Sequence, residues 1–285
     1  MFKFDAIKNE MKTVAIIYDF DGTLAPGNMQ EYDFIPAVGK RSEEFWQEST
    51  QMAEDQDGDT ILAYLYHMIK EANNRDVSLR REAFRESGSK VRLFDGVKEW
   101  FGRINAYAEE RGLKIEHYIN SSGIKEMIEG TPIAHEFKKI YACSFFYNVD
   151  GVAFWPSVVV NYTTKTQFLF KINKGIESVS DNIEINRYIP EDKRRIPFGR
   201  MIYIGDGTTD IPCMRLVKQM GGYSIAVYNS GSQRKIDDIR KLVDDGRVDF
   251  VAPADYRPGS GVDTVVRKIV DRIAINLSLE ELKHK

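Results

Sequence analysis

A short apolar run that stops at two aspartates constrains the fold of this chain more than any other feature. Residues 14–17, Val-Ala-Ile-Ile, predict a buried strand, and the Tyr-Asp-Phe-Asp-Gly-Thr that follows predicts a tight loop at its end. Asp19 and Asp21 therefore lie at the carboxyl end of a strand. In open parallel α/β sheets ligands bind at that edge, because the loops there form a crevice and helix N-termini point into it. We expect an α/β fold with a binding site at this loop.

The two carboxylates suit a divalent cation. On a continuous strand Asp19 and Asp21 would point to opposite faces, but Gly22 lets the backbone curl so that both face one centre. Mg²⁺ prefers carboxylate oxygens and keeps water or phosphate oxygens in its remaining positions. An ordinary solvated turn is the alternative, since Asp and Gly are common turn residues. These three residues alone leave both interpretations open.

Composition narrows the class of protein. A length of 285 residues suggests a core domain that carries an inserted smaller unit. The net charge of -3 gives no electrostatic reason to expect nucleic acid or an anionic membrane surface as a partner. No apolar run reaches transmembrane length, and the first residues lack the apolar stretch of a signal peptide. The two cysteines, Cys143 and Cys213, lie far apart, which favours reduced thiols in a cytoplasmic protein. The oligomeric state stays open.

Residues 28–91 have a different character from the rest of the chain. Pro-Gly-Asn at 26–28 breaks the structure after the acidic loop, and helices are predicted at 42–52, 60–72 and 78–86, with few strand signals. We therefore expect a helical insert over 28–91 and a core domain formed by 1–27 and 92–285.

A second strand ends in small polar residues. Residues 114–120 predict a strand, and Ser121, Ser122 and Gly123 follow it before a helix that begins near 124. At such a turn, free backbone N–H groups and a hydroxyl can hold an anion, and helix capping by serine is a compatible alternative. Further along, two strands are predicted around a hairpin turn at 148–151, and 158–162 predicts another short strand.

Lys165 occupies an unfavourable position. It lies at the start of a helix predicted at 167–176, where the helix dipole disfavours a cation. Either a nearby anion compensates it or the side chain is simply exposed, and Lys171 and Lys174 are rivals for any anion-binding role. The polar residues 178–199 predict an irregular excursion.

A third strand repeats the acidic ending. Residues 201–204 predict a strand that runs into Gly-Asp-Gly-Thr-Thr-Asp, so that Asp206 and Asp210 follow it and a helix begins at 211. The remaining residues predict strands at 224–228 and 248–252, a linking helix at 232–242 and a terminal helix at 262–282.

These motifs, in this order, resemble the four motifs of the haloacid dehalogenase superfamily of hydrolases. The resemblance spans residues 14 to about 214 and is most specific at the first and last motifs. The helical insert is similar to the cap of the phosphoserine phosphatase-like branch. The implied fold is a Rossmann-like three-layer α/β/α core with a mobile, mainly helical cap inserted after the first motif.

The resemblance also implies roles for the motif residues. Asp19 would be the nucleophile that forms an aspartyl-phosphate, and the side chain of Asp21 would act as general acid and base. Mg²⁺ would be held by Asp19, the main-chain carbonyl of Asp21 and Asp206, with Asp210 as a further ligand or an orienting group. Ser121 and Lys165 would neutralise charge on the transferring phosphate. The full set of expected phosphate-binding residues is Gly22, Thr23, Ser121, Ser122, Gly123 and Lys165; Glu31, Tyr32, Phe45 and Trp46 are candidates for substrate recognition.

The expected function is that of a Mg²⁺-dependent phosphatase acting on a small phosphorylated metabolite. Asp21 favours phosphoester hydrolysis, because a leaving halide needs no proton whereas an alkoxide does. A phosphotransferase or phosphomutase would use the same residues. A phospho-accepting signalling domain is the alternative from another class, but it would lack the helical insert. For Phe45 and Trp46, packing within the insert is at least as compatible with the sequence as substrate recognition.

Overall fold

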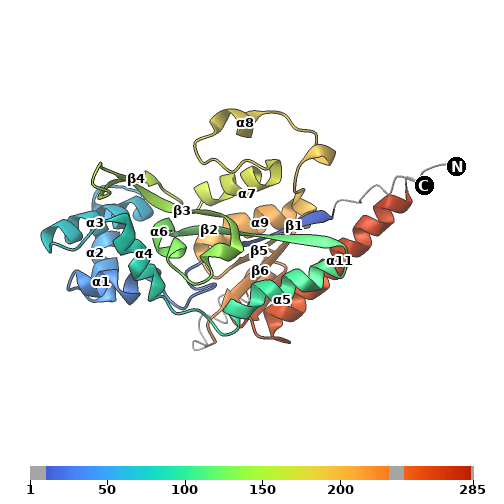
Figure 1. Ribbon diagram of the computed structural model, residues 1–285, viewed down its shortest axis with the longest axis horizontal. Coiled ribbons are helices and arrows are strands. Elements are labelled where there is room, and N and C mark those ends of the chain that lie inside the picture. The colour runs from blue at the N-terminus through green and yellow to red at the C-terminus, as the bar shows by residue number, and fades with distance from the viewer. Residues whose placement is uncertain (1–10, 231–240, 284–285) are drawn as a thin grey trace.

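A seven-stranded sheet forms the centre of the computed structural model, which describes residues 11–230 and 241–283 (Figure 1). The strand order is β4-β3-β2-β1-β5-β6-β7, and neighbouring strands are parallel except β3 and β4. The strands are β1 (Lys12–Tyr18), β2 (Leu113–Ile124), β3 (Phe137–Tyr147), β4 (Ala153–Val158), β5 (Met201–Gly205), β6 (Tyr223–Tyr228) and β7 (Phe250–Pro253). The predicted strand at 14–17 is thus the central strand of the sheet.

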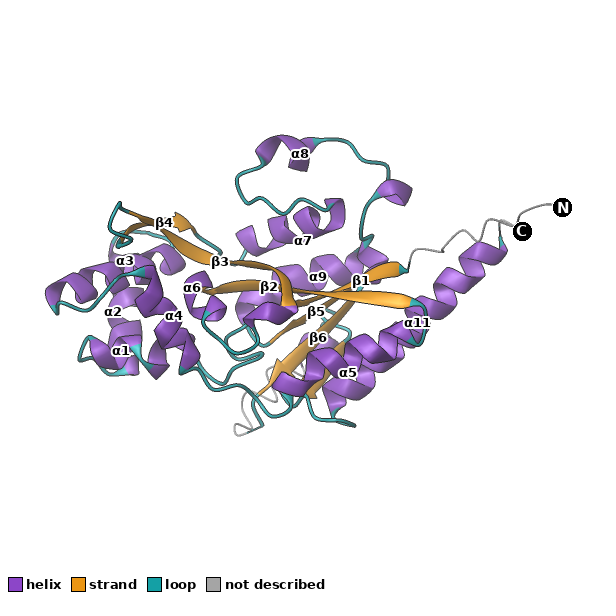
Figure 2. Cartoon of the chain, viewed as in Figure 1, coloured by secondary structure: helices purple, strands orange, loops and turns teal. Residues whose placement is uncertain are grey.

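Helices cover both faces of this sheet and confirm the predicted three-layer fold (Figure 2). One layer contains α5 (Val97–Glu109) and the C-terminal helix α11 (Gly261–Leu282), and the other contains α7 (Thr164–Lys174) and α9 (Ile211–Gln219). Because both faces are covered, β1 carries an uninterrupted apolar run rather than an alternating one.

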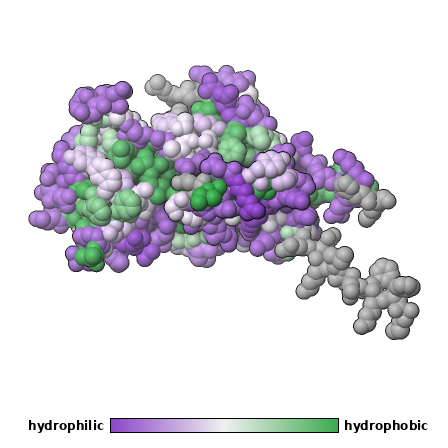
Figure 3. Space-filling model, turned by 90° about the horizontal axis from the view of Figure 1, so that it is seen from above, coloured by the Kyte–Doolittle hydropathy of each residue, from purple (hydrophilic) through white to green (hydrophobic). Residues whose placement is uncertain are grey.

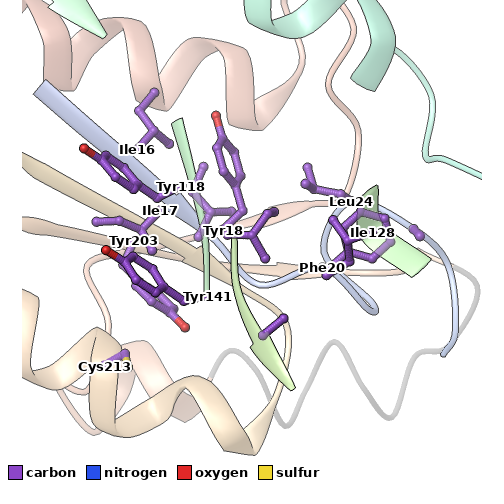
Figure 4. Close-up of a cluster of buried hydrophobic side chains, with 14 of the residues drawn as sticks. Ile16, Ile17, Tyr18, Phe20, Leu24, Tyr118, Ile128, Tyr141, Tyr203 and Cys213 are labelled. Carbon is purple, nitrogen blue, oxygen red and sulfur yellow. The ribbon is translucent and has the colours of Figure 1, made fainter. Parts of the chain in front are cut away.

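Aromatic side chains fill the space between the sheet and the two helical layers (Figure 4). The ring of Tyr18 on β1 lies 6.0 Å from that of Phe101 on α5. On the opposite face, the ring of Tyr141 on β3 stacks on Phe168 of α7 with 4.7 Å between centroids. Aromatic packing therefore holds the sheet against a helical layer on each face, and Tyr18 anchors the end of β1, from which the acidic loop begins.

The predicted helices of the insert gather at one end of the sheet (Figure 1). A 3₁₀ turn, η1 (Met29–Tyr32), opens this region. Asp59 caps helix α3 (Thr60–Asn74), and its Oδ1 accepts a hydrogen bond of 2.8 Å from the backbone N–H of Leu62. The division of the chain at 28–91 into core and insert stays a prediction. The elements within those bounds are η1 (Met29–Tyr32), α1 (Phe34–Ala37), α2 (Ser42–Asp55), α3 (Thr60–Asn74) and α4 (Arg81–Ser89).

Helix α4 of the insert packs directly on the short helix α6 (Lys125–Glu129) that follows β2. A Cβ atom at Gly88 would lie 1.9 Å from the carbonyl oxygen of Met127, and a Cβ atom at Gly130 would lie 1.9 Å from that of Arg85. Only glycine permits this approach at both places, so the two backbones are in contact here.

Two local predictions are wrong. Residues 159–162 form no strand, because Asn161 accepts hydrogen bonds from the backbone N–H groups of Thr163 and Thr164 and so turns the chain into α7. Strand β2 does not stop at Asn120 but continues irregularly to Ile124, with a register shift against β3. The terminal helix is confirmed as α11. Most of the linking helix predicted at 232–242 lies outside the described residues.

The excursion at 178–199 contains short helical segments, and hydrogen bonds from lysines of α7 attach it to that helix. Lys171 donates to the carbonyl oxygens of Ser178 and Asp181 at 2.9 and 3.0 Å, and Lys174 donates to those of Ile185 and Arg187 at 2.5 and 2.7 Å. Both rival lysines therefore bind backbone carbonyls rather than an anion. The pieces are α8 (Asn182–Asn186) and the 3₁₀ turns η3 (Glu191–Lys193) and η4 (Phe198–Arg200); a further turn, η2 (Ala134–Glu136), precedes β3, and η5 (Thr208–Asp210) precedes α9.

The surface is mostly hydrophilic, with hydrophobic areas on the face seen from above in Figure 3. On the β3–β4 hairpin, Phe146 and Phe154 are 54% and 55% exposed and stack at 6.3 Å. Among the described helices, none has both the length and the apolar character needed to cross a membrane.

Candidate active site

The aspartates of the first and last motifs meet where β1 and β5 end. These strands are parallel neighbours, and the backbone N–H of Asp19 donates to the carbonyl of Ile204 at 2.9 Å. One carboxylate oxygen from each of Asp19, Asp206 and Asp210 lies within 4.8 Å of the other two. Acids nearly two hundred positions apart in the sequence thus share one small volume at the carboxyl edge of the sheet, as expected for adjacent parallel strands.

Two glycines make room for these carboxylates. Gly22 has a φ of +75°, and a Cβ atom there would lie 2.0 Å from Oδ2 of Asp206. At Gly205 a Cβ atom would lie 2.5 Å from Cγ of Asp210. The cluster therefore requires the absence of a side chain at each position.

Lys165 lies inside the acidic cluster and is fully buried. Its Nζ is 2.7 Å from Oδ1 of Asp210 and 3.3 Å from Oδ1 of Asp19. The side-chain amide of Asn120 on β2 donates to the carbonyl of Lys165 at 3.0 Å and so ties the start of α7 to the sheet. The sequence left two possibilities for the Lys165 side chain, a nearby anion or exposure to solvent. The structure shows the first, because two carboxylates contact its ammonium.

The electrostatic environment of the cluster changes the protonation of its members. Burial and the neighbouring Asp210 carboxylate raise the pKa of Asp19 to about 6, against the lowering effect of Lys165. Burial lowers the pKa of Lys165, but Asp19 and Asp210 raise it by more, so that its pKa lies above the ordinary value. The lysine therefore stays charged across the physiological range and partly offsets the charge of the two carboxylates.

Asp21 connects the acidic loop to the insert. Its Oδ1 accepts a hydrogen bond of 2.9 Å from the backbone N–H of Met29, the first residue of η1. Burial and the Asp19 carboxylate raise the pKa of Asp21 well above its usual range. A Cβ atom at Gly123 would lie 3.0 Å from Oδ2 of Asp21, so β2 also approaches this side chain closely.

The acids open into a cavity of about 520 Å³ between the sheet edge and the insert. Its floor contains Asp19, Asp21 and Asp206, and residues from the insert and from the end of β6 form its walls. Lining residues on the β2 side are Ser121, Ser122 and Gly123; those from the insert are Gln30, Trp46, Ile61 and Tyr64; others are Gly22, Gly27, Asn28, Phe94, Gly207, Thr209, Ile211, Val227, Tyr228, Asn229 and Leu242.

Several expected phosphate donors have partners within the protein. The N–H of Gly22 donates to the carbonyl of Ala25 at 2.7 Å, and the N–H of Gly123 donates to Oγ of Ser121 at 3.0 Å. Thr23 is fully buried and does not line the cavity. Among the expected phosphate-binding side chains, Ser121 lines the cavity, whereas Lys165 is fully buried and does not line it. The ammonium of Lys165 affects the site through its contacts with Asp19 and Asp210.

Of the four residues of the insert proposed for substrate recognition, three have contacts within the protein and do not line the cavity. Glu31 does not line the cavity, since Oε1 accepts hydrogen bonds from Trp46 Nε1 at 2.7 Å and Asn28 Nδ2 at 2.8 Å. Phe45 is buried and stacks on a histidine, and the Tyr32 hydroxyl donates to a backbone carbonyl. Trp46 alone of these four lines the cavity.

Sequence reasoning missed Tyr203. Its hydroxyl donates to Oδ1 of Asp210 at 2.7 Å, the same oxygen that Lys165 contacts. The available signal was a tyrosine inside the predicted buried strand 201–204, because a buried phenol needs a hydrogen-bond partner and the acids after the strand supply one.

Comparison with known proteins identifies the family. Residues 16–215 match the family model of the haloacid dehalogenase-like hydrolases. The chain belongs to this family. An uncharacterized protein of Borreliella burgdorferi is 32% identical over 275 residues, which cover 87% of this chain and 93% of that protein. The predicted superfamily is confirmed, and the chain is a hydrolase.

Solved structures of similar fold include phosphatases of this family. A hydrolase of Salmonella enterica serovar Typhi has a TM-score of 0.55 at 13% identity, with 90% of this chain and 70% of that chain covered. A phosphoserine phosphatase with a phospho-aspartyl intermediate analogue has a TM-score of 0.51 at 14% identity, with 84% and 93% covered. A probable phosphoserine phosphatase of Vibrio cholerae has a TM-score of 0.55 at 13% identity, with 95% and 67% covered. At these identities the likeness concerns the fold.

Proposed function

We propose that this hydrolase is a Mg²⁺-dependent phosphatase that cleaves the phosphate monoester of a small metabolite through an aspartyl-phosphate on Asp19. The observation that carries the proposal is the convergence of Asp19, Asp206 and Asp210, two of which contact Lys165, at a cavity that Asp19 and Asp206 line. The phosphoserine phosphatase of similar fold that was solved with a phospho-aspartyl analogue supports it by analogy.

The donor set fits Mg²⁺. Three carboxylates gather within 4.8 Å, and Lys165 offsets only part of their charge. Asp19, the main-chain carbonyl of Asp21 and Asp206 would hold the ion, since all are hard oxygen donors. Asp210 suits an orienting role, because Lys165 and Tyr203 contact its Oδ1 and the N–H of Gly207 donates to its Oδ2 at 3.3 Å. When bound, the ion would reduce the repulsion between a carboxylate and a phosphate dianion.

The contacts of Asp19 support a role as the nucleophile. Its Oδ1 is occupied by the N–H of Phe20 at 2.8 Å and lies 3.3 Å from Lys165, which leaves Oδ2 for attack on phosphorus. The new bond joins Oδ2 to phosphorus while the bond from phosphorus to the leaving oxygen breaks. Asp21 donates a proton to that oxygen, so the product leaves as an alcohol rather than an alkoxide.

Water completes the cycle. Asp21, now a carboxylate, takes a proton from a water molecule whose oxygen attacks the phosphorus of the aspartyl-phosphate. Inorganic phosphate leaves and the Asp19 carboxylate is restored. Ser121 and Lys165 stabilise the charge on the transferring group in both steps, and loss of one such donor typically costs about 3 kcal/mol, or about a hundredfold in rate.

Two alternatives differ in the fate of the phosphoryl group. A phosphotransferase or phosphomutase would pass it to a second alcohol instead of water, with the same residues. A phospho-accepting signalling domain would retain it. Asp21, close to the nucleophile and able to activate water, argues against a long-lived phosphoryl group. Release of inorganic phosphate distinguishes the phosphatase from both alternatives, and transfer of the phosphoryl group to a second alcohol distinguishes the alternatives from each other.

The decisive experiment measures phosphate release from a panel of phosphate monoesters by Asp19→Asn and the wild type, with and without Mg²⁺. We expect Asp19→Asn to lose turnover while its circular dichroism stays unchanged, and chelation by EDTA to stop the wild type reversibly. Asp55→Asn, at the end of α2, is the matched control and should keep wild-type turnover. Near wild-type activity of Asp19→Asn would exclude the covalent mechanism, and turnover without divalent metal would exclude the role of Mg²⁺.

A further inference from the structure

Three oxygen atoms share the buried ammonium of Lys165. Its Nζ lies 2.7 Å from Oδ1 of Asp210, and 3.3 Å from both Oδ1 of Asp19 and Oγ1 of Thr209. An ammonium has three protons, so each of these oxygens can accept one of them. The nearest oxygen belongs to Asp210 and not to Asp19. A group that weakens the attraction of Asp210 for the ammonium therefore leaves more of its charge to Asp19.

Tyr203 contacts the oxygen that lies nearest to this ammonium. Its hydroxyl donates to Oδ1 of Asp210 at 2.7 Å, which is also the distance from Nζ of Lys165 to this oxygen. A carboxylate oxygen has two lone pairs, so these two donors occupy Oδ1. From this shared contact we infer that Tyr203 is a positioning residue, which limits the attraction of Asp210 for the ammonium and so keeps the ammonium within reach of Asp19. The inference rests on the nucleophilic role proposed above for Asp19.

Hydrogen bonds to Oδ1 set the orientation of the Asp210 carboxylate. On one side the carboxylate lies against the backbone of β5, because a Cβ atom at Gly205 would lie 2.5 Å from its Cγ. Its Oδ2 accepts a hydrogen bond from the N–H of Gly207 at 3.3 Å, which is longer than is usual for such a bond. The two contacts of Oδ1 are both short. Loss of the one from Tyr203 would leave Oδ1 to pair with the ammonium of Lys165 alone.

The hydroxyl of Tyr203 can be removed with little change in packing. Tyr203 lies in β5 between Ile202 and Ile204, and all three residues are fully buried. A phenylalanine would fill the same space apart from one oxygen atom, so Tyr203→Phe removes the hydrogen bond and keeps the ring. Tyr141 on β3 provides a matched control, because it is also buried and its hydroxyl donates to the backbone carbonyl of Ile176 at 3.0 Å. Each substitution removes one hydrogen bond of a buried tyrosine, but the bond of Tyr203 is the one that ends on the acidic cluster.

Phosphate release by the wild type and the two variants tests the inference, with the ester that the wild type hydrolyses fastest. We expect Tyr203→Phe to lower kcat about tenfold, because a hydrogen bond to a charged group is lost. Its KM should stay within about twofold of the wild type, since Tyr203, Asp210 and Lys165 do not line the cavity and act on the nucleophile rather than on bound substrate. Tyr141→Phe should keep both constants within about twofold.

The outcomes separate this inference from the proposed function. Wild-type kcat in Tyr203→Phe, or an equal loss of kcat in both variants, would overturn the inference while leaving the phosphatase function intact. A rise in KM at unchanged kcat would overturn it as well, because it would place the effect on substrate binding. Failure of the wild type to release phosphate from any ester would instead overturn the proposed function, and this inference with it.

Combination with Lys165→Met provides the second test. That substitution removes the ammonium that Asp19 and Asp210 share. Because Tyr203 is inferred to act through this ammonium, Tyr203→Phe should change kcat by less than about twofold in the Lys165→Met background, instead of about tenfold. A tenfold loss in both backgrounds would show that the hydroxyl acts independently of the lysine, and would overturn the inference.

Discussion

A buried histidine should make this protein progressively less stable in acid. His117 on β2 is 3% exposed, its Nδ1 lies 3.0 Å from the hydroxyl of Tyr18, and its Nε2 lies 2.9 Å from Oδ1 of Asn105. Trp100 donates to the same Tyr18 hydroxyl at 2.8 Å, so the tyrosine gives its proton to Nδ1 and the ring donates from Nε2. Both ring nitrogens of His117 therefore have hydrogen-bond partners that fit the neutral imidazole: Nδ1 accepts a hydrogen bond from Tyr18 and Nε2 donates one to Asn105.

The magnitude follows from the difference in proton affinity between the folded and unfolded states. Burial lowers the pKa of His117 from 6.5 to about 3. The unfolded chain therefore binds a proton that the folded chain refuses, and stability falls as the pH drops below 6.5 and levels off below about 3. At about pH 5 the loss is about 2 kcal/mol, and the full effect is about 5 kcal/mol.

Urea unfolding at about pH 7.5 and about pH 5 measures this effect. The wild type should lose about 2 kcal/mol more than His117→Gln between the two conditions, although the variant is less stable at both. His135→Gln is the control, because that ring is 75% exposed and folding does not desolvate it. If wild type and His117→Gln lose the same stability between the two pH values, the reasoning fails.

Two further predictions concern the site and the packing of the insert. Lys165→Met should lower kcat about a hundredfold in a phosphate-release assay, because the ammonium of Lys165 neutralises Asp19 and Asp210. Lys171, a buried lysine of the same helix, binds backbone carbonyls, so Lys171→Met is the control and should lower stability but keep kcat. Equal losses of kcat in the two variants would contradict the role of Lys165. Gly88→Ala should lower the free energy of unfolding by about 1–3 kcal/mol, since a Cβ atom there would lie 1.9 Å from the Met127 carbonyl oxygen. A Cβ atom at Gly102 would meet no atom within 4 Å, so Gly102→Ala is the control and should raise the free energy of unfolding by up to about 1 kcal/mol. Thermal melts that fail to separate the two variants would exclude the close contact at Gly88.

The parts of the fold that depend on local pattern could be predicted from the sequence. The apolar run at 14–17 and the helical periodicity at 60–72 are properties of neighbouring residues, and the structure has β1 and α3 there. The predicted strand at 158–162 fails because the side chain of Asn161 binds the backbone two and three residues ahead, a competition that β-propensity does not include.

The residues of the site also differ in whether their surroundings could be predicted from the sequence. The acids of the first and last motifs could be brought together from sequence, because parallel strands place their carboxyl ends at one edge. The surroundings of Lys165 could not, since exposure and burial were equally compatible with a lysine at a helix start, and the choice depends on Asp210, 45 residues away. Likewise, Glu31 could be proposed as a recognition residue from its position, but its hydrogen bond with Trp46 of α2, 15 residues away, depends on the tertiary structure.

The insert and the chemistry are coupled through one residue. The backbone N–H of Met29 binds Asp21, and the sulfur of Met29 lies 3.2 Å from the backbone nitrogen of Ile124, beyond the serines of β2. A Cβ atom at Gly123 would lie 2.3 Å from Cε of Met29, so a larger residue there would displace the Met29 side chain. Any movement of η1 therefore alters the position of the proposed acid and base as well as the cavity wall.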